Sequence, residues 1–158
     1  MRFASLATAA ALTIALASAA SAQSFPGAPG GVLVLDGKCS KLVVAKLDAS
    51  KSCKGELASV TMPNGMVTFI FSAGGKMLGF EGDGRAIAPA SGGSVRFPVH
   101  MVSSAVGSKI TGQVEAAGFC TFGNPFAGQP TAVECSAKNK DANFTGSFRT
   151  SGKPPHKK

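Results

Sequence analysis

The stretch Leu57-Ala-Ser-Val-Thr-Met62, Pro63-Asn-Gly65, Met66-Val-Thr-Phe-Ile-Phe-Ser72 decides how this sequence folds. Two β-favouring runs enclose a dense turn signal, which is typical of an antiparallel hairpin. The second run is the most hydrophobic one that follows the N-terminal segment, so we expect it in the middle of a sheet. The rest of the chain is expected to pack around it.

The turn at Pro63–Gly65 admits two registers. A three-residue turn, with the proline at its first central position and the glycine as a bulge residue, pairs Met62 with Met66. A two-residue Asn64-Gly65 turn pairs Met62 with Val67 instead. That second register gathers six residues on one face: Ala58, Val60, Met62, Val67, Phe69 and Phe71. Because a slip of one residue exchanges the faces of a strand, burial favours the two-residue turn, with the proline unpaired.

The N-terminus has the three parts of a Sec signal peptide. Arg2 precedes an apolar Ala/Leu-rich run, and Ala20-Ser21-Ala22 forms a small-x-small cleavage site. The run is too short and too rich in alanine for a transmembrane helix, so we predict cleavage after residue 22. The expected organisation is a signal peptide at 1–22, a flexible leader at 23–31, a β domain at 32–151 and a disordered basic tail at 152–158. The predicted location is periplasmic or secreted.

Four cysteines in an exported chain predict two disulfides, because that compartment is oxidising. Three connectivities are possible. We favour the local pairing, Cys39 with Cys53 and Cys120 with Cys135, in which each bond closes a loop of about fifteen residues and contributes about 3 kcal/mol. A zinc site is the alternative. Neither spacing resembles C-x-x-C, and His100 is the only histidine inside the domain, so no metal is predicted.

Short segments with alternating hydrophobicity recur along the domain at near-regular spacing. Strands are expected at 32–35, 76–81, 94–103, 109–117, 131–138 and 144–150, in addition to the hairpin. The run 42–45 fits a strand or a short helix, Asp36-Gly37 is interpreted as a turn, and Pro98 indicates a sheet edge or a bulge. With twenty glycines and no long helix, the pattern predicts an all-β fold, either an antiparallel β-sandwich or a small barrel.

Lysine is concentrated in two regions of the sequence, and the formal net charge is +8. A basic exported protein can meet anionic lipid, polysaccharide or an acidic partner, and solubility is the competing interpretation. The candidate anion-binding residues are Lys38, Lys41, Lys46, Lys51, Lys54, Lys153, Lys157 and Lys158.

The sequence has no recognisable catalytic constellation. His100 alternates with the apolar residues of its strand and has no carboxylate at local spacing, so we interpret it as a solvated histidine. The stretch Glu81-Gly-Asp-Gly-Arg85 has too few oxygen ligands for a calcium loop and reads as a hairpin turn. A nucleophile elbow and a P-loop are both absent from the sequence. We therefore expect no catalytic residue and no cofactor.

Several short segments resemble small exported proteins of unknown function from alphaproteobacteria. The segments that carry the resemblance are Cys53-Lys-Gly-Glu-Leu57, Pro63-Asn-Gly65, Phe69-Ile-Phe71, Phe80-Glu-Gly82, Gly118-Phe-Cys-Thr-Phe-Gly123, Cys135-Ser-Ala137 and Phe144-Thr-Gly-Ser-Phe-Arg-Thr150. The resemblance covers residues 53–150 and implies an exported, disulfide-bonded β domain. No activity is known for that family, so the resemblance implies none for this chain.

These features predict a non-catalytic exported β domain that binds a partner or an envelope component. One alternative is an electrostatic binder of anionic envelope material, such as lipid or lipopolysaccharide, whose binding weakens with salt. Another is an inhibitor of an exported hydrolase, which presents rigid loops to a cleft. We expect no nucleic-acid partner and no membrane span after signal cleavage.

Overall fold

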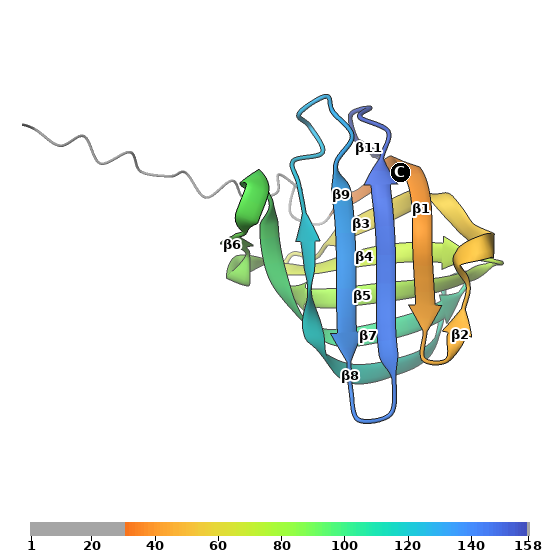
Figure 1. Cartoon of the computed structure of the whole chain (residues 1–158). Coiled ribbons are helices and arrows are strands. Elements are labelled where there is room, and N and C mark those ends of the chain that lie inside the picture. Colours follow the sequence, from red (N-terminus) through yellow and green to blue (C-terminus); the bar gives the residue numbers. More distant parts are fainter. Residues whose placement is uncertain (1–30, 158) are drawn as a thin grey trace, which may run out of the picture.

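The structure is a computed structural model that describes residues 31–157, and its main body is a closed antiparallel barrel of eight strands (Figure 1). The barrel strands are β1 (Gly31–Val44), β3 (Cys53–Thr61), β4 (Met66–Ala73), β5 (Lys76–Asp83), β7 (Val95–Val106), β8 (Lys109–Phe122), β9 (Ala132–Lys138) and β10 (Asn143–Thr150). The connections contain β2 (Leu47–Asp48), β6 (Ala88–Pro89) and β11 (His156–Lys157), and the short 3₁₀ turns η1 (Ser50–Ser52), η2 (Gly84–Ala86) and η3 (Ser91–Gly93). The all-β fold is confirmed, and the barrel is one of its two expected architectures. The predicted signal peptide lies outside the described residues.

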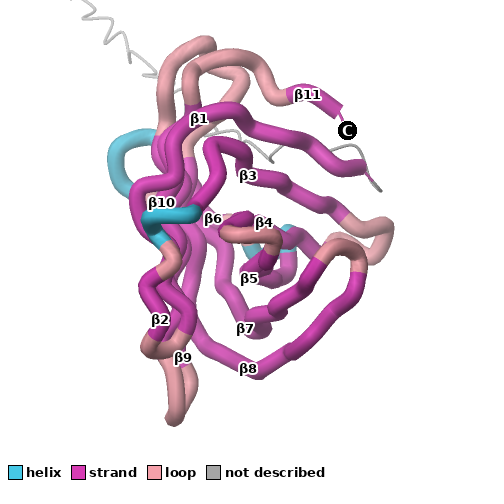
Figure 2. The backbone as a smooth tube through the Cα atoms, turned by 90° about the vertical axis from the view of Figure 1, so that its right-hand side faces the viewer, coloured by secondary structure: helices cyan, strands magenta, loops and turns pink. Residues whose placement is uncertain are grey.

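Each barrel strand pairs with the next barrel strand along the chain, and β10 returns to pair with β1. In Figure 2, β1, β3, β5, β7 and β8 follow one another from top to bottom, with β9 and β10 to their left. The closing ladder runs from Gly37 opposite Thr150 to Val44 opposite Phe144. Closure pairs the first and last barrel strands with each other, although the first half of β8 has no partner strand on its β9 side. Within residues 31–157, no helix is long and apolar enough to cross a membrane.

Phenylalanine rings fill the barrel at the end that carries the β3–β4 turn. Phe69, Phe97 and Phe122 form a cluster with ring centroids 5.6, 5.2 and 6.1 Å apart. Phe71 packs edge-on against Phe80, with the centroids 5.7 Å apart. All five rings are buried, and each aromatic pair adds about 0.5–1.5 kcal/mol to the stability gained from burial of area. These five rings therefore form the centre of the core, whereas Phe119 and Phe126 are 45% and 42% exposed.

The inward-facing side chains become smaller toward the opposite end of the barrel. On β4 the series is Val67, Phe69, Phe71, Ala73. On β7 it is Phe97, Val99, Val102, Ser104, and on β8 it is Phe122, Cys120, Gly118, Ala116. Because small residues follow the rings on three strands, side chains do not fill this end of the interior. We call it the open end; it carries the β1–β2, β4–β5 and β7–β8 turns.

The β3–β4 turn shows that the register we predicted from burial is wrong. Met62 donates its N–H to the Met66 carbonyl at 2.8 Å, and the Gly65 N–H donates to the Met62 carbonyl at 2.9 Å. The turn therefore has three residues, with Gly65 at a φ of 86°. Consequently Leu57 and Ser59 face the core, both almost fully buried. The fixed φ of the proline and the left-handed glycine suit this turn, and their geometry outweighs the cost of burying one serine.

Both disulfides join the cysteine pairs that the sequence favours. Cys39 and Cys53, with Cα atoms 5.7 Å apart, connect β1 to the first residue of β3. The bond lies where β1 no longer pairs with β3 and pairs with β10 instead. Cys120 and Cys135 lie directly opposite each other on β8 and β9, with Cα atoms 4.0 Å apart. Two disulfides are consistent with an extracytoplasmic location.

Two segments differ from their expected structure. The sequence predicts a turn at Asp36-Gly37, but β1 continues through it. A Cβ at Gly37 would lie 2.1 Å from the Arg149 carbonyl oxygen, so the glycine serves the close approach of β10 instead of a turn. The expected basic tail contains β11, which pairs with Leu33 and Val34. β1 is free on that side because its ladder with β10 begins only at Gly37.

The proline inside β7 lies beside a bulge, as predicted. The pairing of β7 with β5 and with β8 shifts register between Val99 and Met101. The β5 ladder reaches β7 only as far as Val99, so β5 does not require the missing N–H of Pro98.

Candidate ligand pocket at the open end of the barrel

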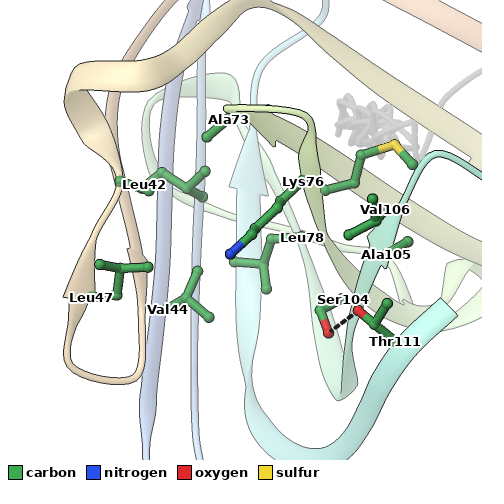
Figure 3. Close-up of a pocket in the computed structure, with 12 residues that line it drawn as sticks. Leu42, Val44, Leu47, Ala73, Lys76, Leu78, Ser104, Ala105, Val106 and Thr111 are labelled. Carbon is green, nitrogen blue, oxygen red and sulfur yellow. Dashed lines mark hydrogen bonds between the residues drawn. The ribbon is translucent and has the colours of Figure 1, made fainter. Parts of the chain in front are cut away.

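The open end of the barrel contains a mainly apolar pocket of about 410 Å³, which we call the barrel-end pocket. Its apolar wall comes mainly from β1, β2, β4, β5 and β7, and it includes Leu42, Val44, Leu47, Leu78, Ala105 and Val106 (Figure 3). Leu42 and Leu78 are buried, whereas Leu47 and Val106 are 59% and 50% exposed at the rim. The volume lies within the range of about 300–1,000 Å³ that is typical of small-molecule sites.

The excursion after β1 holds Leu47 at the rim of this pocket. The chain reverses at Ala45, which has a left-handed φ of 58°, and Leu47 then pairs with Val44. The excursion is tied back to β1 because Ser50 Oγ accepts a hydrogen bond from the Leu42 N–H at 2.9 Å. Since both ends of the excursion are anchored on β1, the side chain of Leu47 stays beside the pocket.

Within residues 31–157, Lys76 is the one charged side chain that lines the pocket. It is the first residue of β5, and strand alternation places it on the same side as Leu78 and Phe80, both buried in the core. Figure 3 shows the lysine side chain pointing into the pocket, toward the wall that contains Val44 and Leu47. The two ion pairs found in residues 31–157 lie elsewhere. The pocket therefore combines an apolar wall with an ammonium group that no carboxylate neutralises.

Polar groups complete the rim on either side. The hydroxyls of Ser104 and Thr111 lie 3.2 Å apart and share a hydrogen bond, drawn as a dashed line in Figure 3. Asp48, beside the rim residue Leu47, accepts a hydrogen bond from the Ser50 N–H at 2.9 Å. Hydrogen bonding to Ser50 holds the pKa of the Asp48 carboxyl below its usual value, and nearby lysines add to the effect. Asp48 does not line the pocket. Its carboxylate instead forms a hydrogen bond within its own loop.

The predicted anion-binding lysines belong to several elements of the structure. Lys46 and Lys51 belong to the excursion after β1, whereas Lys41 lies on β1 itself. Two others, Lys38 and Lys153, line a different groove that also contains the carboxylates of Asp36 and Glu134. Lys54 is the second residue of β3, and Lys157 lies on β11. Lys158 lies outside the described residues. The binding of anions by these lysines stays a prediction.

The residues weighed for acid–base chemistry lie apart from the pocket. His100 is exposed on β7, as expected of a solvated strand histidine. Asp83 caps η2, and its carboxylate accepts hydrogen bonds from Arg85 Nε at 2.8 Å and Nη2 at 2.9 Å. The Arg85 side chain, and then its backbone N–H, lower the pKa of the Asp83 carboxyl. The stretch 81–85 is not the hairpin turn that the sequence predicts: its first three residues end β5, and the chain reaches β7 only after η2, β6 and η3. The ion pair between Asp83 and Arg85 stabilises the start of this connection.

Sequence reasoning missed the barrel-end pocket and its lysine. The one available signal was the alternation of Lys76, Leu78 and Phe80, which places the lysine on the apolar face of its strand. Across the described residues, no three His, Cys, Asp or Glu side chains are grouped so that they could hold a metal ion. Comparison of the chain with protein-family models, with curated proteins and with solved structures gives no match.

Proposed function

We propose that this protein is a non-catalytic exported β domain that binds a small amphipathic anion. The apolar chain of the ligand would occupy the barrel-end pocket, and its anionic head group would lie beside Lys76. The sequence predicts binding of anionic envelope material as an alternative function. The function proposed here is a narrower form of it, because it names one class of ligand. The observation that supports it is the unpaired ammonium of Lys76 on the edge of a mainly apolar pocket.

The apolar wall would supply most of the affinity. Each methylene that leaves water contributes about 0.8 kcal/mol, which is about a fourfold change in Kd. The exposed side chains of Leu47 and Val106 would also lose contact with water when a chain covers them. Affinity should therefore rise with chain length until the pocket is full, and then level off.

Lys76 would supply the preference for an anion. Its ammonium group donates hydrogen bonds and is carried on a flexible chain of methylene groups. These methylene groups can lie along the apolar wall while the charge stays at the rim. Because the side chain is exposed, we expect a contribution of about 1 kcal/mol, or about fivefold in Kd. The charge thus selects the head group, whereas the wall sets the strength of binding.

Isothermal titration calorimetry with the cleaved, disulfide-bonded protein tests the proposal. The probes are decanoate, dodecanoate, dodecyl phosphate and dodecanol; the anions are kept below their critical micelle concentrations and dodecanol below its solubility limit. Dodecanoate should bind more tightly than decanoate, and the two anions with the longer chain should bind more tightly than the alcohol. Equal binding of the alcohol and the anions would refute the role of the charge, and no binding of any probe would refute the function.

Two variants connect the result to the pocket. Lys76→Met should weaken dodecanoate about fivefold while leaving dodecanol unchanged, and Lys54→Met, which alters an exposed lysine outside the pocket, is the matched control. Ala105→Phe should fill the pocket and reduce the binding of all four probes. Unaltered dodecanoate binding in folded Ala105→Phe would show that the ligand binds elsewhere.

A further inference from the structure

The two disulfides of the barrel differ in their exposure. Cys120 and Cys135 are 0% and 1% exposed and belong to the core. Cys39 and Cys53 pack against the same core but are only partly buried. A disulfide is exchanged when a thiolate attacks one of its sulfurs, so the rate of exchange depends on access. In the folded protein, an external thiol therefore reaches the Cys39–Cys53 bond more easily than the Cys120–Cys135 bond.

The two disulfides also differ in the charges beside them. Four exposed lysines lie within two residues of the first pair of cysteines: Lys38, Lys41, Lys51 and Lys54. The one charged residue within two positions of the second pair is acidic, Glu134. Positive charge attracts an attacking thiolate and stabilises the thiolate that leaves, whereas negative charge does the opposite. The surroundings of the Cys39–Cys53 bond therefore favour exchange, and those of the Cys120–Cys135 bond oppose it.

The Cys39–Cys53 bond lies at the base of the excursion after β1, residues 45–52, which borders the barrel-end pocket. Cys53 is the first residue after this excursion. The ladder between β1 and β3 extends only from Gly31 to Asp36 on β1, so the disulfide, and not strand pairing with β3, joins this part of β1 to Cys53. The excursion that it closes carries Leu47 at the rim of the pocket (Figure 3).

We propose that the Cys39–Cys53 bond is a thiol-exchange site, and that its reduction by a dithiol releases the excursion. A thiolate of the dithiol attacks one sulfur of the bond, forms a mixed disulfide and frees the other cysteine as a thiolate. The second thiol of the reductant then displaces the first cysteine. The protein gains two electrons and two protons and ends with two thiols, while the reductant ends as a disulfide. The Cys120–Cys135 bond stays intact.

Reduction leaves the excursion held to β1 by hydrogen bonds and packing. The Ala49 N–H donates to the Leu42 carbonyl at 2.8 Å, and the Leu42 N–H donates to Ser50 Oγ at 2.9 Å. Local hydrogen bonds near the surface open and close without global unfolding. Leu47 would then leave the rim for part of the time, and a ligand would have to order it again on binding. This effect on a ligand rests on the proposed function, whereas the exchange itself does not.

Alkylation during mild reduction tests the exchange site. The folded, disulfide-bonded protein is treated with dithiothreitol, trapped at intervals with iodoacetamide and analysed by peptide mass spectrometry. Cys39 and Cys53 should be labelled about tenfold faster than Cys120 and Cys135, or more. The difference should become small in concentrated urea, where all four sulfurs are accessible. Equal rates for both pairs in the folded protein, or faster labelling of the second pair, would overturn the proposal.

Two monothiols test the role of the lysines. Anionic 3-mercaptopropionate and neutral 2-mercaptoethanol each attack the Cys39–Cys53 bond, and the ratio of their rates measures the attraction of the anion. Lys38→Gln/Lys54→Gln should lower this ratio about threefold at low salt. Lys109→Gln/Lys138→Gln, which alters two exposed lysines distant in sequence from this bond, is the matched control. A ratio that does not change in the first variant would overturn the role of the lysines.

Amide hydrogen exchange tests the release of the excursion. After selective reduction and alkylation, exchange should become about tenfold faster at residues 45–52 and stay unchanged in β8 and β9. Cys39→Ala/Cys53→Ala, which carries no added group, should behave in the same way. Unchanged exchange at residues 45–52 in both proteins would overturn the release.

Calorimetry with dodecanoate then measures the effect on the pocket. The selectively reduced protein should bind dodecanoate about fivefold more weakly than the disulfide-bonded protein, because binding must order the excursion. Equal affinities would overturn the effect on the pocket. If the disulfide-bonded protein binds no dodecanoate, the proposed function fails, whereas the labelling and the amide exchange still decide whether the thiol-exchange site exists.

Discussion

The contact between Gly146 and the Phe71 ring offers a quantitative test of how the barrel core is packed. Gly146 lies on β10 and faces the interior, where Phe71 is 1% exposed. A Cβ added at Gly146 would lie 2.6, 2.7 and 2.9 Å from the ring atoms Cζ, Cε2 and Cε1 of Phe71. Real Cβ contacts are not that short, so Gly146→Ala must displace the ring or the strand.

Two opposing effects determine how much Gly146→Ala lowers the free energy of unfolding. Overpacking of a well-packed core costs about 1–3 kcal/mol. Replacement of a strand glycine by alanine returns about 0.5–1 kcal/mol through the lower entropy of the unfolded chain. We therefore expect Gly146→Ala to lower the free energy of unfolding by about 1–2 kcal/mol. Phe71→Leu by itself should cost about 1–2 kcal/mol, between the loss of one methylene and a Phe→Ala truncation.

The double variant Gly146→Ala/Phe71→Leu should be more stable than the sum of the single effects. Leucine lacks the three ring atoms that the new methyl group would meet, so the methyl group fills the space they leave. We expect a favourable coupling energy of about 1 kcal/mol or more. Urea denaturation of the disulfide-bonded proteins, monitored by circular dichroism, measures the four free energies of the cycle.

A control cycle pairs Gly146→Ala with Phe97→Leu. The Phe97 ring packs against Phe69 and is not among the atoms nearest to the added Cβ. The effects of these two substitutions should add within about 0.5 kcal/mol. If the Phe71 cycle is additive as well, β10 moves away from the core when residue 146 gains a methyl group, and our description of a tight β10–β4 contact is wrong.

Three further predictions concern stability and titration. Ser59→Ala should raise the free energy of unfolding by about 1 kcal/mol, because the Ser59 hydroxyl is buried without a hydrogen-bond partner among the described residues; a loss in urea denaturation would contradict this. Replacing Cys39 and Cys53 together by alanine should lower the free energy of unfolding by about 3 kcal/mol in the same assay, and an unchanged midpoint would contradict the role of this disulfide. Arg85→Gln should raise the pKa of the Asp83 carboxyl, which NMR titration measures directly. Since the pKa of Asp83 is lowered in the folded protein, the ion pair stabilises the protein at pH values above the ordinary carboxyl pKa. This stabilisation is lost as the pH falls through the lowered pKa. If the Asp83 pKa does not move in Arg85→Gln, Arg85 is not the main cause of the lowered pKa.

The sequence by itself determined the features that depend on near neighbours. Alternation placed the strand segments, and the Pro63–Gly65 turn joined two of them into a hairpin. Cysteine spacing indicated both disulfides, because Cys39 and Cys53, like Cys120 and Cys135, are separated by loops short enough to close locally. These signals depend on backbone geometry over a few residues, which the local sequence fixes.

Only the tertiary structure decided what depends on strands far apart in the chain. Closure of the barrel requires the ladder between β1 and β10, which local alternation cannot show. The barrel-end pocket has the same origin, because its wall comes from strands that meet only after closure, and Lys76 reaches it because β5 begins there. The physical reason is that each of these features is a balance of packing over the whole interior, to which any one segment contributes only a small part.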